Sequence, residues 1–186
     1  MTITPKNSGW IEVICGSMFS GKTEELIRRL RRAQIAQMAV AIFKPSIDNR
    51  YSEKQIVSHN QTTMTSHIVK NVKEIESLGR LSEVIGIDEA QFFDSSIINI
   101  CKILADSGKR VIVAGLDTDY RGLPFGPMPH LMCEADYLDK FRAICIKCGN
   151  PASYSQRISF ESGQVLVGEL DKYEARCRNC FEAPKE

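Results

Sequence analysis

The sequence predicts an α/β fold: a parallel β-sheet flanked by helices, followed by a small zinc-ribbon-like module. Short, continuously apolar segments alternate with helical patterns in the first part of the chain. A glycine-rich loop motif stands between the first apolar segment and the first helical pattern, and two C-x-x-C pairs follow near the carboxyl end. We expect residues 1–142 to form a nucleotide-binding α/β domain and residues 143–186 to form the metal-binding module.

The spacing of apolar residues along the chain predicts the first helix and the first two strands. We expect a strand over residues 10–15, a helix over 22–37 and a second strand over 39–44. The apolar face of the helix is made by Leu26, Leu30 and Ala33. Residues 45–66 are polar and carry few signals of regular structure, so we expect a mobile loop there.

The next elements repeat the alternation. A short apolar strand is expected over residues 84–87, a helix from Ser95 or Ser96 to about Ser107, and a strand over 110–115. The inward face of that helix consists of Ile97, Ile100, Cys101 and Leu104. Because the strands are apolar throughout, the sheet should be parallel and covered on both faces.

Composition limits the class of protein. The chain of 186 residues is 43% apolar and 25% charged, which is typical of a folded globular protein. Its formal net charge of +1 argues against the broad positive field of a dedicated nucleic-acid binder. No apolar run approaches the roughly 20 residues that span a bilayer, and residues 1–9 lack a signal-peptide core. We therefore expect a cytoplasmic protein with no nucleic-acid or membrane partner.

The loop motif fits G-x-x-x-x-G-K-[ST], the pattern of a phosphate-binding P-loop. It consists of Gly16, Ser17, Met18, Phe19, Ser20, Gly21, Lys22 and Thr23. The glycines let backbone N–H groups turn inward toward phosphate oxygens, and the following helix points its positive end at the same anion. Lys22 is expected to reach the β- and γ-phosphates of a nucleotide, and the Thr23 hydroxyl to bind Mg²⁺.

An acidic pair, Asp88 and Glu89, follows directly after the apolar strand that ends at residue 87. In a P-loop enzyme, a carboxylate at this point holds Mg²⁺, usually through water, which suits Asp88. Glu89 suits the second task, which is to orient or deprotonate the nucleophile. The pair alone fits a hydrolase that activates water as well as a kinase that activates a hydroxyl, and acids at a helix start are also common without function.

Four cysteines form two C-x-x-C pairs, Cys145 with Cys148 and Cys177 with Cys180. Four thiolates match a closed, tetrahedral structural zinc site, whereas nothing near either pair suggests a thioredoxin-like redox site. The cytosol keeps cysteine thiols reduced, so disulfides are not expected. The other cysteines, Cys15, Cys101 and Cys133, are interpreted as buried apolar residues.

Taken together, these motifs resemble the cellular-type (type II) thymidine kinases over nearly the whole chain. The resemblance is carried by GSMFSGKT at 16–23, DEAQFF at 88–93, GLD at 115–117, PFG at 124–126 and DKY at 171–173, together with the cysteine pairs. It implies a RecA-like P-loop domain, a zinc-bearing module with a lasso loop over residues 165–170, and phosphorylation of thymidine, and also of deoxyuridine, by Mg-ATP. It further implies a homotetramer that dTTP inhibits.

The resemblance also implies roles for individual residues. Glu89 corresponds to the general base. The ATP and Mg²⁺ set comprises the loop residues 16–23 with Asp88, Glu89, Ala90 and Gln91. The nucleoside set comprises Met18, Arg50, Phe92, Leu116, Tyr120, Phe125, Ser155, Val165, Leu166, Val167, Gly168 and Tyr173. Two positions depart from some family members: Cys180 replaces a histidine that would also bind zinc, and Tyr120 replaces a phenylalanine and adds a hydroxyl.

Three other functions compete with this interpretation. A nucleic-acid-linked ATPase would use the zinc module as a nucleic-acid reader, and near-neutral charge disfavours it. A sensor that binds ATP without turnover would have no need of a base such as Glu89. Only the family resemblance argues against a kinase that acts on a different nucleoside.

Overall fold

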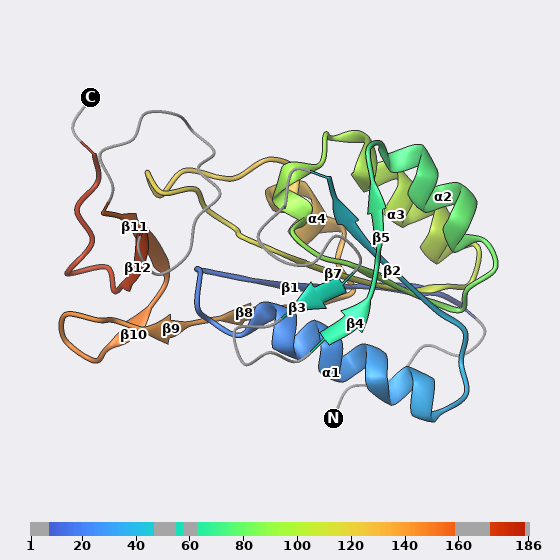
Figure 1. Ribbon diagram of the computed structural model, residues 1–186. Helices are drawn as coiled ribbons and strands as arrows, with labels where there is room; N and C mark the ends of the chain where they lie inside the picture. Colours follow the sequence, from blue (N-terminus) through green and yellow to red (C-terminus); the bar gives the residue numbers. More distant parts are fainter. Residues whose placement is uncertain (1–7, 47–54, 58–62, 159–171, 185–186) are drawn as a thin grey trace.

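The computed structural model describes residues 8–46, 55–57, 63–158 and 172–184. At its centre lies a six-stranded sheet in the order β5-β2-β6-β7-β1-β8, in which every neighbouring pair is parallel (Figure 1). The strands are β1 (Trp10–Gly16), β2 (Val40–Pro45), β5 (His67–Val69), β6 (Val84–Ile87), β7 (Arg110–Gly115) and β8 (Tyr137–Phe141). The predicted parallel sheet is confirmed.

Helices cover both faces of the sheet. Helix α1 (Lys22–Ile35) lies on one face, and α2 (Val72–Gly79), α3 (Ser96–Asp106) and α4 (Met128–Glu134) lie on the other (Figure 1). Because side chains alternate along a strand, Val13 and Val113 face the three helices, whereas Ile14 and Ile112 face α1. The continuously apolar strands of the sequence therefore fill two separate cores.

The contact between α1 and the sheet explains why a glycine is needed at position 86. The predicted apolar face of α1 is buried, and Leu30 lies directly over Gly86 in β6. A Cβ atom at Gly86 would stand 2.7 Å from a methyl carbon of Leu30. The absence of a side chain at this position lets the helix that follows the P-loop lie close to the sheet.

Several elements differ from the sequence-based expectation. Helix α1 ends at Ile35, two residues before the predicted end, and Gln37 then takes a left-handed conformation with φ 60°. Within residues 45–66, where we expected a loop, the described part contains β3 (Gln55–Val57) paired antiparallel with β4 (Thr63–Thr65). Met64 is buried in the core beneath α1 and attaches this hairpin to the domain. Residues 47–54 and 58–62 lie outside the described chain.

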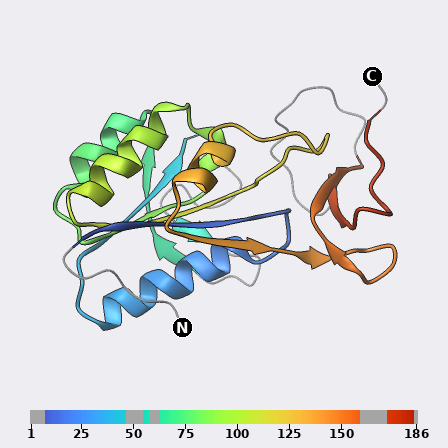
Figure 2. The same cartoon turned by 180° about the vertical axis from the view of Figure 1, so that it is seen from behind.

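The second module consists of two small antiparallel ribbons beyond the carboxyl end of β8 (Figure 2). Strand β9 (Ala143–Ile144) pairs with β10 (Pro151–Ala152), and β11 (Tyr154–Arg157) pairs with β12 (Tyr173–Arg176). The boundary predicted at residue 142 falls between β8 and β9, and it stays a prediction. No helix of the described chain is long and apolar enough to cross a membrane.

Candidate active site and metal centre

The P-loop lies between β1 and α1, as the motif predicts. Its backbone takes left-handed conformations at Phe19, with φ 63°, and at Gly21, with φ 86°. The carbonyl oxygen of Ser17 accepts hydrogen bonds from the Lys22 ammonium and the Ser20 hydroxyl, both at 2.7 Å. The loop therefore curls back on itself at the start of α1, with the Lys22 side chain folded over it.

The acidic pair meets the P-loop at the carboxyl edge of the sheet. Asp88 follows β6 directly and is buried, with 6% of its surface exposed. The Thr23 hydroxyl lies 3.2 and 3.4 Å from the two carboxylate oxygens of Asp88. A hydroxyl and a carboxylate side by side next to a phosphate-binding loop are the donor set that P-loop enzymes use for Mg²⁺. The two predicted magnesium residues are thus brought together.

Glu89 turns away from the strand direction because its backbone is left-handed, with φ 51°. A short 3-10 turn, η1 (Ala90–Phe92), follows it. The amide of Gln91 donates a hydrogen bond of 2.5 Å to the Glu89 carboxylate and accepts one of 2.9 Å from the Leu116 backbone N–H. The Ala90 side chain, by contrast, is fully buried in the sheet core.

The residues predicted to contact the nucleoside fall into four local groups. The rings of Phe92 and Phe125 meet edge to face, with their centroids 5.6 Å apart. Leu116 joins the Glu89 group through the bond to Gln91. The Ser155 hydroxyl accepts a hydrogen bond of 3.0 Å from the Met18 backbone N–H, so two predicted residues are joined across the two modules.

The fourth group is organised by Arg157, a residue that the sequence motifs did not indicate. Its guanidinium carbon lies 3.8 Å from the ring centre of Tyr120 and 5.4 Å from that of Tyr173. It also donates to the Tyr173 hydroxyl at 2.8 and 3.2 Å. A signal was present in the sequence, since Ser155 and Arg157 stand two residues apart on β11 and so point to the same face. Arg50 and residues 165–168 lie outside the described chain.

The four cysteines predicted to bind a metal come together. Their sulfur atoms all lie within 4.8 Å of one another, and Cys148 Sγ is 3.6 Å from both Cys177 Sγ and Cys180 Sγ. A tetrahedral zinc site with Zn–S bonds of about 2.3 Å requires sulfur atoms about 3.8 Å apart. The cluster therefore fits a four-coordinate, soft divalent metal such as zinc.

The pKa values of the cluster's thiols also favour a bound metal. Burial opposes ionisation of Cys145, but backbone N–H groups of Cys177, Lys147 and Cys148 outweigh it and lower the pKa of that thiol to about 6. Hydrogen bonds with Cys148 and Cys177 raise the pKa of Cys180 to about 12. The pKa is thus lowered at Cys145 and raised at Cys180, and a divalent cation would allow both to bind as thiolates.

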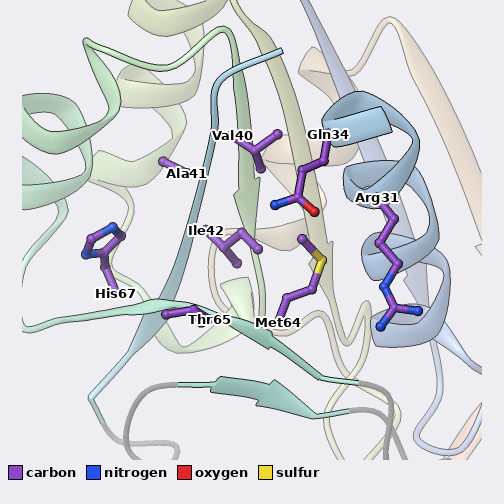
Figure 3. A pocket seen from close by; sticks show the side chains of 8 residues that line it. All are labelled: Arg31, Gln34, Val40, Ala41, Ile42, Met64, Thr65 and His67. Atoms are coloured by element: carbon purple, nitrogen blue, oxygen red, sulfur yellow. The ribbon is translucent and has the colours of Figure 1, made fainter. Parts of the chain in front are cut away.

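A cavity of about 550 Å³ lies apart from these groups, between α1, β2, β4 and β5 (Figure 3). Arg31 and Gln34 extend toward it from α1, and Met64 borders it from the hairpin. Neither the P-loop nor the acidic pair contributes to its lining. This cavity is the space beneath the β3–β4 hairpin and does not belong to the candidate phosphate-transfer site.

Comparisons with known proteins agree with the motifs. The sequence model of the family described as thymidine kinase matches residues 9–181. A thymidine kinase from Rhodothermus sp. (strain ITI 518) is 56% identical over 177 residues, which cover 95% of this chain and 83% of that protein.

Two solved structures show a weaker likeness. AMPPCP-bound DnaA from Aquifex aeolicus aligns at 17% identity with a TM-score of 0.43, over 74% of this chain and 42% of that one. Domain III of the replication initiation protein DnaA from Thermotoga maritima aligns at 15% identity with a TM-score of 0.42, over 72% of this chain and 55% of that one. At such TM-scores these two likenesses carry no argument about function.

Proposed function

The chain belongs to the thymidine kinase family, and from that membership we propose that it transfers the γ-phosphoryl group of Mg-ATP to the 5′-hydroxyl of thymidine. The product would be thymidine monophosphate. One observation carries the proposal: Thr23, Asp88 and Glu89 lie together at the P-loop. The P-loop would bind the phosphates, Thr23 and Asp88 would hold the metal, and Glu89 would take the proton of the acceptor hydroxyl.

Phosphoryl transfer demands positioning and charge stabilisation more than covalent chemistry. The curled backbone of the P-loop and the start of α1 would bind the phosphates, and Lys22 would neutralise charge on the transferred group. Thr23 and Asp88 would hold the magnesium ion that accompanies ATP, directly or through water, and that ion would offset charge on the phosphate oxygens. Glu89 would accept the proton that the 5′-hydroxyl loses as the new P–O bond forms.

The nucleoside would lie against the groups around Phe92, Phe125 and Tyr120. Apolar and aromatic walls suit the methyl group of thymine, and a few polar groups such as Tyr173 would orient the base. Arg50 and the lasso over residues 165–170 would complete the site, the lasso contacting the nucleoside through residues 165–168. We further propose that deoxyuridine is accepted, that dTTP inhibits, and that the chain acts as a homotetramer in the cytoplasm.

We assign structural zinc to Cys145, Cys148, Cys177 and Cys180. Four sulfur ligands leave no open position for a substrate or water, so the metal would cross-link the two knuckles of the module and take no part in the reaction. The spacing of the sulfur atoms supports this assignment.

The first test is transfer of labelled phosphate from ATP to thymidine, deoxyuridine, deoxycytidine or deoxyguanosine, each offered separately beside a reaction without acceptor. We expect a labelled product with thymidine and with deoxyuridine and none with the other two. Phosphate release with no labelled nucleoside would instead indicate an ATPase and exclude the kinase proposal.

The Glu89→Gln variant tests the base. We expect it to bind nucleotides normally and to lose turnover by about 10²–10⁴-fold, the usual contribution of a general base. Glu76→Gln, which alters a half-buried carboxylate on α2 that pairs with Arg80, serves as the control and should keep full turnover. Near-normal turnover in Glu89→Gln would remove Glu89 from the proposed role.

A further inference from the structure

We propose that Gln91 is a positioning residue that fixes the direction of the Glu89 carboxylate for proton transfer. The proposal rests on the proposed function, in which Glu89 is the general base, and it separates Gln91 from the nucleotide-binding set with which the family resemblance groups it. Three features of the molecule support this role: the hydrogen bonds of Gln91, the packing around Gln91 and the backbone conformation of Glu89.

The hydrogen bonds of Gln91 determine how its amide is oriented. The Leu116 N–H can only donate, so the Gln91 carbonyl oxygen must face it, at 2.9 Å. An ionised carboxylate can only accept, so the Gln91 amide nitrogen must face Glu89. Both partners demand the same orientation. Gln91 therefore joins the Glu89 carboxylate to the backbone at the end of β7.

The surroundings leave Gln91 no room to move. The residue is buried, with 3% of its surface exposed. A Cβ atom at Gly126 would stand 2.3 Å from the Gln91 backbone oxygen, and one at Gly115 would stand 2.8 Å from its side-chain oxygen. The segment at Gly126 thus approaches the Gln91 backbone so closely that only glycine fits there, and the segment at Gly115 packs against the end of its side chain. A side chain held in this way is a rigid support for the group that it contacts.

Glu89 needs such a support more than most side chains. Its left-handed backbone, with φ 51°, is a conformation that costs free energy and is retained when surrounding structure imposes it. Its backbone N–H donates to Asp88 at 3.0 Å, which holds the main chain. A general base must come within about 2.6–3.2 Å of the proton that it accepts. The bond from Gln91 acts directly on the carboxylate and restrains its direction.

The Gln91→Met variant removes both hydrogen bonds at nearly constant length. We expect kcat for thymidine phosphorylation to fall about 10–10²-fold, the effect of a displacement of roughly 1 Å at a reacting group. The KM values for ATP and thymidine should stay close to those of the wild type, since neither substrate contacts Gln91 in this proposal. A raised KM for ATP at unchanged kcat would make Gln91 a nucleotide-binding residue and overturn the proposal.

Two further variants guard against a simple folding defect. Gln91→Glu keeps the size and the acceptor for Leu116 but places a second carboxylate against Glu89, so kcat should fall at least as far. Met128→Leu alters packing on the other side of Gly115 without touching the Glu89–Gln91 bond, and it should keep normal kcat. Normal kcat in Gln91→Glu would overturn the proposal even if Gln91→Met failed to fold.

A double-mutant cycle gives the decisive readout. If Gln91 acts through Glu89, adding Gln91→Met to Glu89→Gln should cause no further loss of kcat. An added loss as large as that in the wild-type background would show an independent, merely structural role. The outcomes are separable from those of the proposed function, because a wild-type chain that makes no thymidine monophosphate fails before any variant is compared.

Discussion

The α/β domain and the second module are held together in different ways. The domain buries large aliphatic side chains on both faces of its sheet, among them Ile14, Leu30 and Ile87. The strands of the module have only two to four residues, and its buried cluster consists of Ala143, Cys145, Ala152, Ala175 and Cys177. Because the free energy of burial scales with apolar area, so few small side chains stabilise little. We therefore expect the module to depend on the metal assigned to its four cysteines, whereas the domain depends on its core.

The candidate active site lies where these two regions meet. The Ser17 hydroxyl donates to the Ala152 carbonyl at 3.1 Å, and the Met18 N–H donates to the Ser155 hydroxyl at 3.0 Å. Phe19 packs against the small core of the module. Three successive P-loop residues therefore rest on the metal-dependent region, and the state of the metal should influence how ATP is bound.

The largest effect is expected from the metal site. Cys148→Ser should release the metal and unfold the module, because structural zinc supplies on the order of 10 kcal/mol to small domains of this kind. The parallel sheet should remain folded, since its two cores do not include the cysteine cluster. Metal content, limited proteolysis and circular dichroism would measure the three parts of this prediction.

Cys133→Ser is the matched control, because Cys133 lies outside the cluster and is exposed, so the expectation that it is buried was wrong. It should leave metal content and proteolysis unchanged. If Cys148→Ser kept its metal, the zinc assignment would be wrong. If its sheet unfolded together with the module, the two regions would not differ in stability as proposed here.

A smaller effect is expected within the domain, at the buried carboxylate of Glu12. Burial alone would raise its pKa, but hydrogen bonds from Arg110, Trp10 and Arg29 outweigh this and hold the pKa below the usual 4.5. Glu12→Gln should cost about 3 kcal/mol of unfolding free energy at neutral pH, because it leaves two half-buried arginines without this buried partner. Arg29 keeps an ion pair with Asp139, which limits the loss.

The pH dependence of that loss follows from the lowered pKa. A carboxylate whose pKa is lower in the folded than in the unfolded state stabilises the fold above the unfolded value, and this contribution disappears as pH falls through the folded value. The difference between wild type and Glu12→Gln should therefore be constant near neutrality and shrink below about pH 4.5. Urea unfolding at several pH values would measure it. An equal difference at every pH would contradict this account.

Local patterns predicted much of the molecule. The apolar runs at β1, β6 and β7 and the amphipathic patterns of α1 and α3 are signals within single segments, and the structure confirms them. The P-loop motif and the cysteine pairs are equally local. A cap before α2 could also have been read, because Asn71 is followed three residues later by Glu74, whose carboxylate accepts from the Asn71 N–H at 3.2 Å.

The remaining features depend on contacts between distant segments. Strand β8 lies at the edge of the sheet and is mostly exposed, so its sequence lacks the apolar run of a central strand. Gln91 meets the backbone of Leu116 from 25 residues away. Arg157 and Tyr120 approach each other only after the module has folded against the domain. No periodicity in the sequence reports such pairs, which explains why their arrangement came from the structure alone.

The smallest expected effect comes from the contact between the two regions. Ser155→Ala removes the acceptor of the Met18 N–H and leaves that half-buried donor without this partner, at a cost of about 1 kcal/mol. Metal content should not change, because Ser155 is not part of the cysteine cluster. Affinity for ATP should fall about fivefold, as expected for a P-loop that has lost one of its supports. Ser153→Ala, a change between β10 and β11 and two residues before Ser155, should bind ATP normally. Equal ATP affinity in Ser155→Ala and wild type would mean that the P-loop holds its shape without the module, and that the metal affects only the part of the chain that binds it.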